Sequence, residues 1–361
     1  MNISHERVRQ QIVNILRGWG MADDLVQTTA DAMVETDLLG VDSHGISMLM
    51  AYEQRKIEGK LNLAARPTII RETPAMAVVD GQAGLGHPVS VFAMNLAVDK
   101  ALKIGVAGVG VRNSHHFGAT GVYARIASKR GVIGMVTSAT RGITMVPTRG
   151  KIPVLGTNPI AFSAPARRNR PFTLDMATTT SAANKVKVYD LNNKKLPEGW
   201  VVDNEGKVVT DPGKAMKMMQ DGSKSGGITP VGGSEAMASY KGYGLAMLAH
   251  ILGGTLNGGS FSPIREKTQQ DKDPDNIGHF FLAIDPGAFR GEGEFENDLD
   301  DVIDVMHATP PLDPSRPVLV AGDPEAMERD KRLKMGIPIP EKLDKHIRDI
   351  CGRCGAEYVL T

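Results

Sequence analysis

The segment 105–121 constrains the fold of this chain more than any other part. Small and β-branched residues, bounded by glycine, predict a buried strand at 105–110. Apolar residues then recur at helical spacing until an Arg-Gly pair that ends the pattern. His115 and His116 stand between the two patterns, so we expect them on a strand-to-helix connection.

Histidines on such a connection can reach a ligand, because a rigid scaffold holds connecting segments at the surface. The start of the following helix offers backbone N–H groups to an anion. Histidine is also the side chain whose ordinary pKa lies nearest neutrality. The segment therefore predicts a place for proton transfer.

Composition limits the classes of partner. Lys and Arg total 42 against 41 Asp and Glu, which argues against nucleic acid or an anionic membrane as the main partner. Two cysteines, Cys351 and Cys354, are too few for a disulfide framework. We see neither a secretory signal nor an apolar run long enough for a membrane span, so we expect a cytoplasmic, soluble protein.

Both ends of the chain carry helical patterns. Apolar residues recur at helical spacing over 4–20, 22–40 and 46–57, and the tail 324–354 returns to helix. We expect the two ends to form one discontinuous helical domain, residues 1–73 with about 324–361.

The middle of the chain, residues 74–323, is expected to form an α/β domain. A long helix is predicted at 89–104, a very apolar and therefore buried helix at 243–256, and a hairpin around 203–207. Helices separate only some of the predicted strands, which indicates a mixed sheet rather than a regular doubly wound one. The strand patterns lie at 76–80, 106–112, 132–138, 160–164, 172–175, 200–202, 278–285 and 318–321.

Several common catalytic motifs are missing from the sequence. No GxGxxG follows a strand, and GxxxxGK[ST], GxSxG and HExxH do not occur. A hydrolytic triad is improbable at the adjacent residues 42–44, because its members normally come from separated segments. What remains is a set of polar residues on glycine-flanked loops, at His44, His116, 156–159, 174–178 and 240–244.

Each of these signals alone has an ordinary structural explanation. A lone histidine is more often structural than catalytic, and the Gly-Thr-Asn-Pro stretch at 156–159 is a good turn. Asp175 could cap a helix, and Lys241 could be a surface charge. Their co-occurrence is what favours a functional site.

Taken together and in order, six short motifs resemble the malate/L-lactate dehydrogenase family, which includes ureidoglycolate, sulfolactate and diketogulonate oxidoreductases. The resemblance covers nearly the whole chain, from Val8 to Glu325. The motifs are DSHG at 42–45, NSHHFG at 113–118, LGTNP at 155–159, LDMAT at 174–178, KGYGL at 241–245 and IGHFF at 277–281.

The resemblance implies a homodimeric NAD(P)-dependent 2-hydroxyacid oxidoreductase whose cofactor domain is not a Rossmann fold. Carried over motif by motif, it implies acid–base roles for His44 and His116 and substrate-side positions for Ser43 and Tyr52. It implies that the nicotinamide cofactor, NAD or NADP, is held by Thr120, Thr140, Asp175, Met176, Ala177, Tyr240, Lys241, Gly322 and Asp323.

Met48 departs from the family pattern. Many members carry an arginine at this position, and that arginine is a natural clamp for a carboxylate. Arg141, Arg149 or Lys185 could replace it, or the substrate could present another group there. A helix starting near His44 would place residues 44, 48 and 52 on one face.

We therefore expect hydride transfer between the nicotinamide and C2 of a 2-hydroxy or 2-keto acid, with histidine as acid and base. A metal-dependent hydrolase or lyase with His44, His116, His279 and Asp175 as ligands is an alternative. These residues lack a recurrent ligand spacing, so we predict no metal site. A catalytically inactive binding module is a third possibility.

Overall fold

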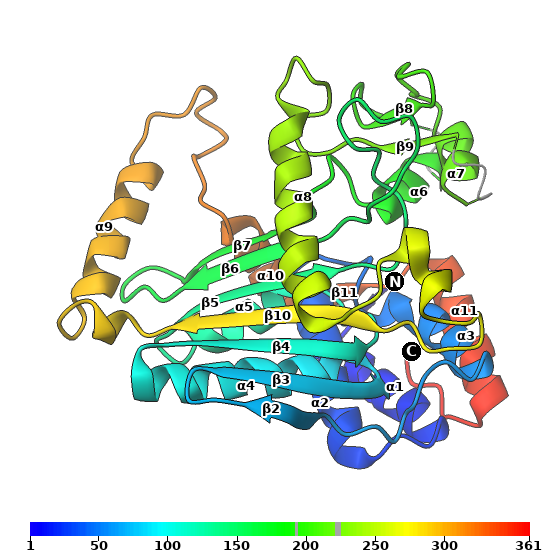
Figure 1. Ribbon diagram of the computed structural model, residues 1–361, viewed down its shortest axis with the longest axis horizontal. Helices are drawn as coiled ribbons and strands as arrows, with labels where there is room; N and C mark the ends of the chain where they lie inside the picture. Colours follow the sequence, from blue (N-terminus) through cyan, green and yellow to red (C-terminus); the bar gives the residue numbers. More distant parts are fainter. Residues whose placement is uncertain (192–193, 221–224) are drawn as a thin grey trace. The chain divides into compact units, whose positions relative to one another are not determined.

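The structure, a computed structural model, describes residues 1–191, 194–220 and 225–361 and divides into two compact units (Figure 1). Unit 1 comprises Met1–Val136, Ala161–Asp175 and Phe281–Thr361. Unit 2 comprises Thr137–Ile160 and Met176–Phe280. Each unit is described by itself.

A seven-stranded mixed sheet runs in the order β2-β3-β4-β10-β5-β6-β7. β3 pairs parallel with β4 and antiparallel with the edge strand β2. This arrangement confirms the predicted α/β class with a mixed sheet. The strands are β2 (Thr68–Glu72), β3 (Met76–Gly84), β4 (Val106–Ser114), β5 (Ile133–Ala139), β6 (Ile160–Ala164), β7 (Phe172–Met176) and β10 (Ile277–Ile284).

Helix α4 (Gly86–Ile104) packs on β4, and α5 (Thr120–Ser128) packs beside α4 (Figure 1). The contact is made of small and β-branched side chains that interdigitate closely, among them Ala93, Ala97 and Val109, all fully buried. The strand–loop–helix segment predicted around the histidines is therefore built into the core of unit 1.

Both chain ends contribute to a second hydrophobic core in unit 1. Val8 and Ile12 from the N-terminal end pack in one cluster with Ile347 and Ile350 from the C-terminal end. The predicted domain boundaries at 73 and 324 both fall inside unit 1, and the division into a helical and an α/β domain stays a prediction. The elements are β1 (Asn2–Ile3), which pairs with β11 (Ile337–Pro338), and helices α1 (His5–Gly18), α2 (Asp23–Leu38), α3 (Leu49–Ile57), α10 (Asp323–Met335) and α11 (Glu341–Cys354).

Unit 2 has two smaller cores. Its short strands β8 (Val201–Asp203) and β9 (Gly226–Ile228) pair antiparallel. The backbone N–H of Asp203 donates to the carbonyl of Lys207, which confirms the chain reversal predicted at 203–207. The helices are α6 (Ala183–Leu191), α7 (Pro212–Gln220), α8 (Ser239–Gly253), η2 (Thr255–Asn257) and η3 (Ser262–Lys267).

The predicted burial of the helix at 243–256 is wrong in detail. α8 buries His250 and small residues such as Ala246 and Ala249, whereas Leu248 and Ile251 are 41% and 50% exposed. Hydropathy indicated burial because the helix is apolar on all sides, but it cannot say which side is covered. None of the helices in the described parts of the chain is long and apolar enough to span a membrane.

The strand predicted at 318–321 is also wrong. This segment is irregular chain that ends in a turn before α10, and its carbonyls at Ala321 and Val320 accept backbone hydrogen bonds from the N–H groups of Thr173 and Asp323. Sequence patterns missed several elements, among them β2, all of whose residues are exposed, and α6, which buries Val186 but is short and polar overall. The elements missed include β2, α6, α7, β9 and η3, together with η4 (Pro286–Ala288) and α9 (Glu294–His307) in unit 1.

Candidate active site

His116 lies on the connection between β4 and α5, as predicted. β4 ends at Ser114, and α5 begins at Thr120. The connection is fastened to α5, because the Phe117 ring stacks on Tyr123, whose hydroxyl also donates to the Phe117 carbonyl. The half-buried His116 ring therefore stands on a rigid support.

The hydroxyl of Tyr52, on α3, lies 2.8 Å from Nδ1 of His116. The backbone N–H of Gly118 also donates to this nitrogen, at 3.3 Å. Tyr52 is buried, and burial raises the pKa of its phenol far above the ordinary value, so the hydroxyl stays protonated. A hydroxyl both donates and accepts, so this bond can survive protonation of the imidazole ring.

His44 stacks on His116, with ring centroids 5.4 Å apart and an interplanar angle of 29°. Ser43 Oγ lies 2.7 Å from Nδ1 of His44. Burial lowers the pKa of His44, so its ring is neutral at pH 7. Two imidazolium rings at this separation would repel each other, which disfavours a state in which both rings are positively charged. The structure thus brings Ser43, His44, Tyr52 and His116 together.

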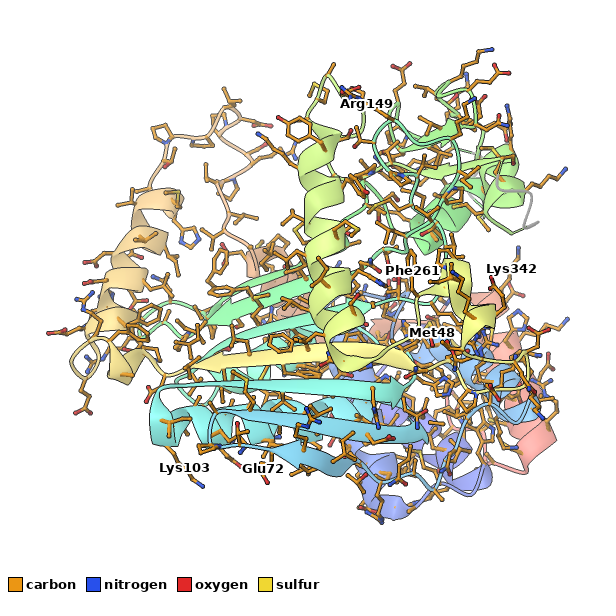
Figure 2. All side chains as sticks on the ribbon, viewed as in Figure 1. Met48, Glu72, Lys103, Arg149, Phe261 and Lys342 are labelled. Carbon is orange, nitrogen blue, oxygen red and sulfur yellow. The ribbon has the colours of Figure 1, made fainter. Side chains whose placement is uncertain are left out.

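Met48 does not share a helix face with His44, which corrects that prediction. Gly45 has non-helical dihedral angles (φ −93°, ψ −133°), so the helix starts only at Ile46, as the 3₁₀ turn η1 (Ile46–Met48). Met48 then caps the start of α3 and packs, partly buried, against the core formed by the chain ends (Figure 2).

Asp175 caps the start of α5. Its Oδ2 accepts a hydrogen bond of 2.7 Å from the N–H of Gly121, so that amide is not open to a ligand anion as the sequence suggested. Although the residue is exposed, desolvation by the surrounding protein raises the pKa of its carboxyl to about 6. Nearby Glu325 raises it further, while the Gly121 hydrogen bond opposes both effects. Thr120, the first residue of α5, is buried beside it.

Gly322 and Asp323 mark the start of α10, also in unit 1. Gly322 has a left-handed conformation (φ 101°) that favours glycine. The Asp323 carboxylate accepts from the N–H of Val320 at 2.9 Å and lies 2.7 Å from Nε2 of His307. Asp323 therefore already has two protein partners.

The remaining predicted residues lie in unit 2. Thr140 donates through its N–H and its hydroxyl to Oδ1 of Asn158, at 3.1 and 3.2 Å. Asn158 in turn donates to the carbonyl of Ala246 in α8. The Gly-Thr-Asn-Pro segment thus ties the residue-140 loop to α8, which supports its structural interpretation.

The three cations considered as replacements for an arginine at position 48 all have partners within unit 2. Arg141 pairs with the buried carboxylate of Asp275. Arg149 pairs with Glu235 near the start of α8 (Figure 2), and the ammonium of Lys185 lies 5.5 Å from the ring centroid of Trp200. A substrate carboxylate would have to compete with these groups.

Lys241 and Tyr240 are exposed in the first turn of α8. The cap residue Ala238 offers no side-chain hydrogen bond to this helix end. The N–H groups of Ser239 and Lys241 already donate to backbone carbonyls, so it is the cation at the helix start that suits a phosphate, and an exposed aromatic ring suits a planar heterocycle. These two residues therefore fit the chemistry of a nicotinamide dinucleotide. Met176 and Ala177, at the end of β7, are partly exposed.

His279, the third histidine of the metal-dependent alternative, is fully buried in unit 2, with Nδ1 2.9 Å from Ser138 Oγ. Over residues 1–191, 194–220 and 225–361, no three His, Cys, Asp or Glu side chains lie close enough together to hold a metal ion. Among these described residues, the metal-dependent hydrolase or lyase therefore has no set of metal ligands.

Sequence reasoning missed His87, a buried histidine at the start of α4. Its ring lies edge-on to Tyr52, with centroids 5.6 Å apart, and neither ring nitrogen has a protein partner. Burial lowers the pKa of His87 to about 3, so the ring is neutral. Its position in Gly-Leu-Gly-His-Pro, after a turn, was the only available signal.

Comparison with known proteins decides the family. The model of the malate/L-lactate dehydrogenase family matches residues 3–348. The chain belongs to that family. It is 34% identical to the malate dehydrogenase of Pyrococcus horikoshii over 99% of this chain and 96% of that one. It is also 34% identical to the L-sulfolactate dehydrogenase of Methanocaldococcus jannaschii, over 98% of each chain.

Solved structures agree with the assignment to the malate/L-lactate dehydrogenase family. The crystal structure of malate dehydrogenase from Entamoeba histolytica superposes with a TM-score of 0.93 at 30% identity, over 99% of each chain. The protein is accordingly a dehydrogenase that acts on a CH–OH group, and the family implies a nicotinamide cofactor.

Proposed function

We propose that this dehydrogenase oxidises a 2-hydroxy acid at C2, or reduces the corresponding 2-keto acid, with NAD or NADP and with His116 as the acid–base group. The observation that carries the proposal is the cluster of His116, His44 and Tyr52, with its short hydrogen bond and stacked rings. The relatives named as malate and L-sulfolactate dehydrogenases support the substrate class.

In the direction of oxidation, His116 accepts the proton of the substrate hydroxyl, and in reduction its imidazolium returns that proton. The hydroxyl of Tyr52 stays bonded to Nδ1 in both states and keeps the ring oriented. His44 stays neutral because of its lowered pKa, so it orients the substrate oxygen rather than supplying the proton. The bound nicotinamide supplies the hydride chemistry. Such proton transfer contributes about 10²–10⁴-fold to the rate.

We assign binding of the cofactor to Lys241 and Tyr240 in unit 2, with Thr140, Met176 and Ala177, and to Thr120, Asp175, Gly322 and Asp323 in unit 1. The exposed ammonium of Lys241 at a helix start supports a role toward the phosphates. Ser43 and Met48 are assigned to the substrate side. Arg141 binds the substrate carboxylate only if it exchanges its partner Asp275 for the substrate.

We also propose that the enzyme is a homodimer. The exposed apolar side chains of α8, such as Leu248 and Ile251, support an interface that a single chain leaves open. Sedimentation at several concentrations tests this proposal, and a monomer at micromolar concentration contradicts it.

A substrate panel tests the proposed activity. Purified protein is assayed by nicotinamide absorbance with 2-hydroxy and 2-keto acids, including malate, lactate and sulfolactate, and with both cofactors. Turnover that a metal chelator leaves unchanged supports the proposal. Hydrolysis or elimination that the chelator abolishes supports the metal-dependent alternative, and cofactor binding without turnover on any acid supports an inactive binding module.

A further inference from the structure

Arg332, on helix α10 in the C-terminal part of the chain, contacts the loop that carries Ser43 and His44. Its Nη1 donates to the main-chain carbonyl of Asp37 at 2.7 Å and also to the carboxylate of Asp42. Its Nη2 donates to the other carboxylate oxygen of Asp42 at 3.2 Å. One guanidinium thus holds both the last turn of α2 and the residue next to Ser43.

The Arg332 side chain is itself fixed on α10. Its Nε donates to Glu328, one turn earlier, at 2.8 Å. The arginine side chain is only 8% exposed, whereas the Asp42 side chain is 56% exposed. The guanidinium is therefore a buried anchor held on α10, and the more exposed partner in the ion pair is the loop residue.

The other end of the loop is fixed by the side chain of Asp37. Its Oδ2 accepts a hydrogen bond of 2.8 Å from the N–H of Ile46. The carboxyl also fills the space beside Gly45, where an added Cβ would lie 1.9 Å from Oδ1. Asp37 therefore holds the loop through its carbonyl at one end and its carboxyl at the other.

We propose that Arg332 is a positioning residue for His44, acting through Asp42 and the main chain of Asp37. This inference rests on the proposed function, since it matters for catalysis only if His44 faces the substrate. Without the guanidinium, residues 41–45 lose the anchor that fixes the histidine over His116. A displacement of about 1 Å at a reacting group can lower turnover by about 10²-fold.

Arg329 offers a matched control on the same helix. It also ties α10 to α2, through Glu35 at 3.0 Å, a residue that lies outside the 41–45 loop. Arg332→Gln and Arg329→Gln each remove one arginine that ties α10 to α2, the first through the Asp37 carbonyl and the second through an ion pair with Glu35. Only the first removes the anchor of the loop.

Turnover is the first measurement. We expect Arg332→Gln to lower kcat by about tenfold or more with the KM for the cofactor nearly unchanged, while Arg329→Gln stays within about threefold of the parent. Arg332→Lys should fall between Gln and the parent, because it keeps the charge but loses the two-pronged geometry. Equal losses in the two glutamine variants would overturn the proposal, because Arg332 would then be only a tie between helices.

Two further readouts need no activity. In Arg332→Gln, the NMR pKa of His44 should return toward the ordinary value, and amide hydrogen exchange at 44–46 should quicken. An unchanged His44 pKa and unchanged exchange overturn the inference even if the enzyme is active. If the parent turns over no 2-hydroxy acid, the proposed function fails, yet these readouts still decide the inference. Should Arg332→Gln not fold, Asp42→Asn removes the charge on the loop side of the ion pair and leaves the bond to the Asp37 carbonyl, so it is expected to give smaller shifts in the same direction.

Discussion

Tyr52 and His116 are 64 residues apart in the chain, and their side chains meet in a hydrogen bond of 2.8 Å. Tyr52 comes from the helix that follows the Ser43–His44 loop, and His116 comes from the end of a central strand of the sheet. The bond therefore links the helical core formed by the chain ends to the sheet. It also sets the orientation of the ring to which we assign proton transfer.

Replacing Tyr52 by phenylalanine tests that orientation. Tyr52→Phe should lower kcat by about five- to tenfold, which corresponds to the roughly 1 kcal/mol of a hydrogen bond, because the His116 ring loses its partner at Nδ1. The melting temperature should change little, since the buried ring is retained. Unchanged kcat and an unchanged pH–rate profile would show that the hydroxyl does not orient the catalytic ring.

An arginine at position 48 tests the missing carboxylate clamp. Met48→Arg should raise kcat/KM for small 2-hydroxy acids, by up to the equivalent of about 1.5–3 kcal/mol for a charged hydrogen bond. Met48→Leu, which keeps the packing without the charge, serves as the control. Because Met48 also packs against the core, a lower melting temperature with no gain on any acid would mean that this position does not face the substrate.

The raised pKa of the Asp37 carboxyl predicts that the free energy of unfolding depends on pH. Burial raises the pKa of its carboxyl to about 8 from an ordinary value of 3.8, with a further rise caused by Asp42. Between about pH 4 and about pH 8 the unfolded chain has lost this proton and the folded chain keeps it, so the free energy of unfolding falls as pH rises. Asp37→Asn cannot ionise and should lose this slope.

Urea denaturation at several pH values in that window measures the effect. The free energy of unfolding of Asp37→Asn minus that of the parent should increase as pH rises. Parallel curves for the two proteins would mean that the Asp37 carboxyl is not held protonated in the fold.

Ile347 tests the core shared by the two chain ends. Ile347→Ala should lower the free energy of unfolding by about 2–5 kcal/mol, because the side chain is fully buried. Met335→Ala, which removes a 61% exposed side chain from the same tail, should cost little. Faster hydrogen exchange in α1 is also expected in Ile347→Ala. Faster exchange confined to α11 would show that the ends do not share a core.

The sequence predicted best those features that depend on local pattern. The stripe of Val8, Ile12 and Leu16 on the first helix is buried as periodicity predicted. The outward face of α8 was not predictable, because an apolar pattern contains no information about which neighbours cover it. The edge strand β2 was missed for the opposite reason, since an exposed strand needs no alternation.

The residues of the candidate site likewise divide into those that the sequence could predict and those that it could not. His44 and His116 stand out in motifs that can be recognised by eye, and the structure stacks their rings. The role of Arg332 could not be read from sequence, because its contact with Asp37 joins positions 295 residues apart and depends on how the tail packs. His87 carries no motif, and only its burial beside Tyr52 draws attention to it.

The most direct test of the account is the turnover of His116→Ala on the acid and cofactor that the panel identifies. If His116 transfers the proton, kcat should fall by about 10²-fold or more, while cofactor affinity, measured by fluorescence, stays within a few-fold and the fold is retained. The pH–rate profile should also lose the limb that this histidine controls. Turnover within about threefold of the parent, with the profile unchanged, would contradict the account.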